Sequence, residues 1–155
     1  MSEGFETTRT SERAERDAQA RRTRVLILDD HRASRDVCAG YCDLFDHVCV
    51  SVAGVAEALA ALRRERFDAM VMGLGMAGRD TLSTLKAIRA LPGPAGAVPI
   101  VGLAAVGRGD EAQRWLAAGL AAVVAKPVTA ARLFAALGAA TTAASGVSRS
   151  WARAD

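Results

Sequence analysis

The sequence predicts an α/β domain in which helices cover both faces of a parallel sheet. Five short apolar runs alternate with segments of helical periodicity over residues 24–140. Runs such as RVLIL at 24–28 and AMVM at 69–72 are apolar at every position, which is typical of strands buried on both faces. Aromatic residues make up only 5% of the 155 residues, so alanine, valine and leucine must supply most of the core.

The five strand–helix units follow one another closely. The first strand is predicted at 24–28, and its helix runs through DDHRAS to about Leu44. The later strands are expected at 47–53, 67–72, 98–104 and 121–125, and their helices at 55–65, 81–91, 110–119 and 129–140. Gly119 closes the fourth helix, and PGPAGA at 92–97 is expected to be a loop. Five units of this length predict a flavodoxin-like, doubly wound sheet that binds ligands at the carboxyl ends of its strands.

Two arms flank this domain. Residues 1–23 mix Glu and Arg without an apolar face, which predicts a flexible, solvated arm that is helical from Ser11. Residues 141–155, TTAASGVSRSWARAD, are small and polar and then rich in arginine around Trp151. We therefore expect the last helix to end near residue 140 and a separate flexible tail to follow. The predicted parts are 1–23, 24–140 and 141–155.

Composition and motifs exclude several functional classes. The net charge of +3 is too small to indicate duplex DNA as a partner. The sequence has no run of 18 apolar residues and no hydrophobic signal region, so we expect a cytoplasmic protein without membrane insertion. The patterns GxxxxGK[ST] and GxSxG are absent, which argues against an enzyme. Cys38 and Cys42 are expected to pack as small apolar groups.

Four stretches carry a resemblance to a known family. LILDDH, FDAMVMGLGMAG, VPIVGLAA and VVAKPV, in this order and spacing, resemble the receiver domain of response regulators, the CheY-like fold, over residues 24–140. The resemblance matches Asp29 and Asp30 to the metal-binding acidic pair of the family and Lys126 to its phosphate-binding lysine. It places Gly73 at the position of the phosphoacceptor aspartate.

Two further working parts of a receiver are replaced. Ala104 falls on the Ser or Thr that closes over the phosphoryl group, and Val123 falls on the aromatic residue that switches rotamer. Because glycine offers no carboxylate nucleophile, we predict that Gly73 makes the domain a pseudo-receiver without phosphorylation-driven switching. No tightly bound metal is expected, because the acidic pair alone supplies few ligands for Mg²⁺. Alternatively, the acidic pair persists as helix-capping carboxylates and Lys126 as their ion-pair partner.

The C-terminal segment SRSWAR, residues 148–153, suggests a ligand. Arg149 and Arg153 lie four residues apart with Trp151 between them, and Ser148 and Ser150 are neighbouring candidate ligand-binding residues. Guanidinium groups pair with guanine edges and phosphate, and an indole stacks on a purine. With the CheY-like domain, this segment resembles the Cle group of CheY-like cyclic di-GMP effectors. The resemblance implies cyclic di-GMP as ligand and a protein target in the flagellar motor or the surface-attachment machinery.

The domain side of such an anion site has weaker candidates, and other interpretations stay open. Arg32, Arg35, Arg79 and Arg108 fall in or near loops at the carboxyl edge of the sheet. Trp151 could instead plug the domain as a simple apolar group, and the tail arginines could be solubilising charges. Trp115 falls on a face that receivers use for partners, or packs half-buried. The alternative function is a ligand-independent adaptor that binds a signalling kinase, a phosphotransfer protein or a motor component.

Overall fold

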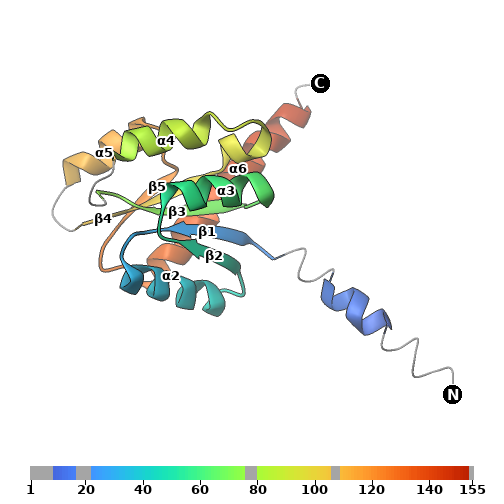
Figure 1. Cartoon of the computed structure of the whole chain (residues 1–155). Helices are drawn as coiled ribbons and strands as arrows, with labels where there is room; N and C mark the ends of the chain where they lie inside the picture. Colours follow the sequence, from blue (N-terminus) through green and yellow to red (C-terminus); the bar gives the residue numbers. More distant parts are fainter. Residues whose placement is uncertain (1–8, 17–21, 76–79, 106–108, 154–155) are drawn as a thin grey trace, which may run out of the picture.

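A single parallel sheet forms the centre of the molecule (Figure 1). The computed structural model describes residues 9–16, 22–75, 80–105 and 109–153, without the side chains of 109–110 and 144–153. The strands lie in the order β2-β1-β3-β4-β5, and every neighbouring pair is parallel. Their bounds are β1 (Arg24–Leu28), β2 (Val48–Val52), β3 (Ala69–Gly73), β4 (Ile100–Ala104) and β5 (Ala122–Ala125). The predicted flavodoxin-like, doubly wound sheet is confirmed.

Helices cover both faces of the sheet (Figure 1). On one face lie α3 (Val55–Arg64), α4 (Thr81–Arg89) and α5 (Gly109–Ala117), and on the other lie α2 (Arg32–Leu44) and α6 (Ala130–Arg153). The two faces explain why the strands are apolar throughout. Leu26 and Leu28 pack under α3 and α4, whereas the alternate residues Val25 and Ile27 pack under α2 and α6.

The predicted packing of two cysteines is confirmed. Cys38 and Cys42 are buried on the inner side of α2, within the cluster that this helix shares with α6. Burial raises the pKa of Cys38 to about 11 and the pKa of Cys42 to about 12. Both side chains are therefore neutral thiols at physiological pH and behave as small apolar groups.

The structure specifies three segments outside the central strand–helix units more closely than the sequence does. The predicted end of the last helix near residue 140 is wrong, because α6 continues to Arg153. The loop at PGPAGA contains a 3₁₀ helix, η1 (Gly93–Ala97). The expected helix in the N-terminal arm is present at residues 9–16. Among the described helices, none is long and apolar enough to cross a membrane.

Candidate functional site

The carboxyl ends of four strands bring the predicted site residues together. Asp29 directly follows β1, Gly73 ends β3, Ala104 ends β4, and Lys126 directly follows β5. The parallel register aligns these ends, with Leu28 opposite Met72, Gly73 opposite Leu103, and Ala104 opposite Ala125. The sequence therefore located the correct edge of the sheet, which is where open α/β sheets bind ligands.

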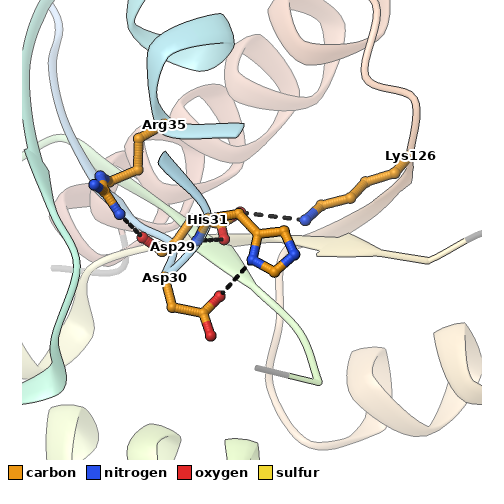
Figure 2. Close-up of polar contacts among 5 residues, drawn as sticks. All are labelled: Asp29, Asp30, His31, Arg35 and Lys126. Atoms are coloured by element: carbon orange, nitrogen blue, oxygen red, sulfur yellow. Dashed lines mark hydrogen bonds and ion pairs between the residues drawn. The ribbon is translucent and has the colours of Figure 1, made fainter. Parts of the chain in front are cut away.

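Asp29 is the buried centre of this site (Figure 2). Its side chain is only 2% exposed, and its carboxylate Oδ2 lies 3.3 Å from Lys126 Nζ in an ion pair. The other oxygen, Oδ1, accepts a hydrogen bond of 3.0 Å from the backbone N–H of His31. Both oxygens thus have partners, as a buried carboxylate requires. The ion pair between Lys126 and the acidic pair, one of the sequence-based alternatives, is present.

Neither member of the acidic pair is itself the N-cap residue of α2. That residue is His31, whose own side chain makes no capping hydrogen bond. Asp29 instead stabilises the turn that leads into α2 through the N–H of His31. Asp30 is half-buried, and its Oδ1 lies 3.3 Å from Nδ1 of the exposed His31.

Gly73 has no space for a side chain. An ideal Cβ on this buried residue would lie 2.9 Å from both Cγ and Oδ2 of Asp29, closer than real Cβ atoms approach other atoms. The Asp29 carboxylate therefore occupies the position where a side chain of residue 73 would begin. Any larger residue forces Asp29 to move, although Lys126 and His31 hold it in place.

Nearby carboxylates do not replace the missing side chain. Asp68 lies before the start of β3, and its Oδ2 accepts a hydrogen bond from the backbone N–H of Arg24 at the opposite edge of the sheet. Asp80 caps α4, where it accepts from the N–H of Leu82. Both carboxylates therefore have structural partners away from residue 73.

Two positions that respond to phosphorylation in receivers carry apolar side chains in this chain. Ala104 presents a methyl group, and its backbone oxygen accepts a bond of 2.7 Å from the N–H of Lys126. Val123 is partly buried and packs against the cluster beneath α3, α4 and α5. Trp115 also packs half-buried against this cluster, as one sequence-based interpretation expected.

Two of the four arginines predicted to form the domain side of an anion site already have partners. The Nη1 of Arg35 donates a hydrogen bond of 2.8 Å to the backbone oxygen of Asp29 (Figure 2). The Nε of Arg32 lies 3.8 Å from Asp36 in an exposed ion pair one turn along α2. Arg79 lies outside the described residues, as does Arg108.

The predicted ligand-binding segment lies on the last turns of α6. Ser148, Arg149, Ser150, Trp151 and Arg153 belong to this helix, and their side chains are outside the described part of the structure. Positions 149 and 153 share one helix face, whereas position 151, two residues away, does not. The structure therefore does not bring the segment together with Arg32 or Arg35 as a described site.

Comparison with known proteins shows the family. The family model "Response regulator receiver domain" matches residues 25–138, so the chain belongs to the response regulator receiver family. It is 33% identical over 117 residues to the sensory/regulatory protein RpfC of Xanthomonas campestris pv. campestris, covering 75% of this chain and 16% of that protein. It is 32% identical to the sensor histidine kinase AruS of Pseudomonas aeruginosa, covering 74% and 12% respectively. The chain thus spans less than one-fifth of the length of these relatives.

A solved structure supports the same assignment. The receiver domain of the sensor histidine kinase PA1611 of Pseudomonas aeruginosa, with a magnesium ion in its active-site cleft, matches with a TM-score of 0.68 and 25% identity. The match covers 78% of this chain and 98% of that domain. The protein is thus a receiver-domain protein of two-component signalling.

The described side chains around Asp29 do not fit a tightly held magnesium ion. Asp29, Asp30 and His31 offer three ligand atoms within 4.8 Å of one another, which adds His31 to the acidic pair identified from the sequence. Imidazole nitrogen is a poor magnesium ligand, and Mg²⁺ requires oxygen atoms in near-ideal octahedral geometry. The Lys126 ammonium also lies against Asp29, and Gly73 contributes no carboxylate.

Proposed function

We propose that this chain is a pseudo-receiver, which acts as a protein-binding adaptor in a two-component pathway without being phosphorylated. The observation that carries the proposal is the position of the Asp29 carboxylate at 2.9 Å from where a Cβ of residue 73 would lie. Lys126 neutralises this carboxylate, so Asp29 has its counter-charge within the protein.

Receiver chemistry supports the same interpretation. Formation of an aspartyl phosphate needs a carboxylate nucleophile and a cation that neutralises the transferred phosphoryl group. Gly73 lacks the nucleophile, and Ala104 lacks the hydroxyl that would bind the product. What remains is a folded receiver surface, whose partners by family membership are signalling kinases and phosphotransfer proteins.

Phosphorylation with a small phosphodonor tests this proposal. Incubation with acetyl phosphate and Mg²⁺, followed by intact-mass measurement, should show no added phosphoryl group. Gly73→Asp restores only the nucleophile, and we expect it to leave the fold unswitched because Ala104 and Val123 are unchanged. Stoichiometric aspartyl phosphate in the wild-type chain would refute the pseudo-receiver.

A second candidate function is the binding of cyclic di-GMP, favoured by the sequence of residues 148–153. Arg149, Trp151 and Arg153 supply two planar forks and one stacking surface, the groups that bind guanine and phosphate. Because the three positions do not share a helix face, one ligand can engage all three only if the end of α6 unwinds. This unwinding lowers the affinity, since ordering a new conformation costs free energy on binding. The target of the ligand-bound form would be a protein such as a flagellar motor component.

Titration with cyclic di-GMP, with GTP as a control, separates the two candidates. We expect Trp151→Ala to weaken binding by about 1–3 kcal/mol through loss of stacking. Arg149→Lys should cost about 1–3 kcal/mol, because lysine keeps the charge but loses the fork. Arg132→Lys on the first turns of the same helix is the matched control and should bind normally. Equal weak binding of both nucleotides by all variants would leave the adaptor function alone.

A further inference from the structure

A second surface lies at the amino edge of the sheet, opposite the Asp29 site. A groove of about 370 Å³ separates the end of α3 from the connection between α4 and β4. Its floor consists of the buried apolar residues Leu62, Phe67, Leu91 and Val98, and Pro92 and Pro94 form one side. A groove of this size and lining fits a large apolar side chain.

The rim of this groove is positively charged. Arg63, Arg64 and Arg66 line it and are exposed, and within the described residues no carboxylate forms an ion pair with them. Glu65 also lines the groove, but its Oε2 lies 3.3 Å from Nη2 of Arg24. The uncompensated charge of the rim is thus that of three arginines, which favours an acidic occupant.

One segment of this chain has the matching composition. Residues 1–8, MSEGFETT, lie outside the described residues and contain two glutamates and no basic residue. Phe5 stands between Glu3 and Glu6 and is the only aromatic residue before β1. An aromatic ring flanked by carboxylates complements an apolar floor with an arginine rim.

The covalent connection brings this segment to the correct edge. Arg24 begins β1 beside the groove, where its Nε donates to the backbone oxygen of Arg66 at 3.1 Å. Between Phe5 and Thr23, eight residues at 9–16 are helical and span about 12 Å. The remaining residues extend at most about 3.3–3.6 Å each, so the arm is long enough to return to the groove.

We propose that residues 2–6 of the N-terminal arm bind in this groove, with Phe5 on the apolar floor and Glu3 and Glu6 on the arginine rim. The contact is intramolecular, because a short tether keeps the segment at a high effective concentration near its site. The arm thereby covers three arginines of the amino edge. This proposal is independent of whether the Asp29 site can be phosphorylated.

Photo-cross-linking in the full chain tests the contact. Replacement of Phe5 by p-benzoylphenylalanine, followed by irradiation and peptide mapping, should give intramolecular cross-links to residues 62–67 and 91–98. The double variant Arg64→Glu/Arg66→Glu should lower the yield about fivefold, since each exposed charge pair contributes modestly and both signs are reversed. Sodium chloride at high concentration should likewise lower the cross-link yield of the chain in which the rim arginines are unchanged.

The matched control is Arg114→Glu/Arg132→Glu, which makes the same change of charge on α5 and α6, away from the groove. Its cross-link yield should equal that of the parent chain. Hydrogen exchange at residues 62–67 provides a second measurement, and Phe5→Ser should speed it if the arm covers the groove. Cross-links spread over other surfaces, formed only between two chains, or insensitive to the rim variant would overturn the proposal.

Discussion

The charged residues at the two edges of the sheet differ in burial and in ion pairing. At the carboxyl edge, the carboxylate of Asp29 is buried and is bonded by Lys126 and by the backbone of His31. At the amino edge, three exposed arginines line an apolar groove, and no carboxylate within the described residues pairs with them. The central carboxylate at the first edge is thus paired within the protein, whereas the arginines at the second edge are exposed.

We therefore expect the charged residues of the first edge to affect stability and those of the second edge to affect binding. Removing one partner of a buried ion pair destabilises the fold, because the other charge is left uncompensated, whereas exposed unpaired charges are available for recognition. Because Gly73 has no side chain, the Asp29 carboxylate lies where a Cβ of residue 73 would stand. Variants at the two edges should therefore change different properties.

The largest effect is expected for Lys126→Met. Removal of the ammonium leaves the Asp29 carboxylate, 2% exposed, without its counter-charge, and Lys126 itself is 31% exposed, which moderates the loss. We expect a decrease of about 2–3 kcal/mol in the free energy of unfolding, measured by urea denaturation.

Two controls sharpen this first test. Arg64→Met at the amino edge should change the free energy of unfolding by less than about 0.5 kcal/mol. Adding Asp29→Asn to Lys126→Met should recover most of the loss, because the neutral amide needs no counter-charge. A loss below about 0.5 kcal/mol for Lys126→Met would show that Asp29 does not depend on Lys126 for its stability in the fold.

A smaller loss is expected when residue 73 gains a methyl group. Gly73→Ala places a Cβ against the Asp29 carboxylate, and the resulting overpacking should cost about 1–2 kcal/mol by the same measurement. The cost should vanish in the background Asp29→Ala, so a double-mutant cycle should give a coupling of similar size. Additive effects of the two substitutions would mean that Asp29 does not occupy the space at residue 73.

A third variant compares two kinds of arginine at the amino edge. Nη1 of Arg89 donates to the backbone oxygens of Gly96 at 3.0 Å and Val98 at 2.7 Å, and burial lowers the pKa of this guanidinium. Arg89→Lys loses the planar fork and should cost about 1 kcal/mol. Arg64→Lys should have no measurable effect, and equal effects of the two would remove the distinction between structural and free arginines.

The sequence predicted the strands and the site position well, because both depend on local patterns. Apolar runs identified β1 and β3 closely, and the position of Lys126 after the last strand predicted its meeting with the acidic pair. The contact between Asp29 and the empty position at Gly73 could not be predicted, because it depends on a side-chain rotamer. The groove was missed for a similar reason, since its floor is contributed by two segments about thirty residues apart.

The length of α6 was underestimated because threonine, serine and glycine were interpreted as an end of the helix. The structure shows why Thr141 does not interrupt it. Its hydroxyl donates a hydrogen bond of 2.9 Å to the backbone oxygen of Leu137, so the polar group is satisfied within the helix. Neighbouring alanines, which have the highest helix propensity, then allow the helix to continue.

The smallest effect is expected from removing residues 144–155. Among the described side chains of α6, those buried in the core are Leu133, Leu137 and Ala140, all of which precede the deletion. The truncated chain should therefore unfold within about 0.5 kcal/mol of the full chain in urea. A larger loss would mean that Trp151 packs on the domain as an apolar plug, and it would weaken the case for a nucleotide-binding segment. An unchanged stability with lost cyclic di-GMP binding would instead assign the end of α6 to recognition, as a third region distinct from both edges of the sheet.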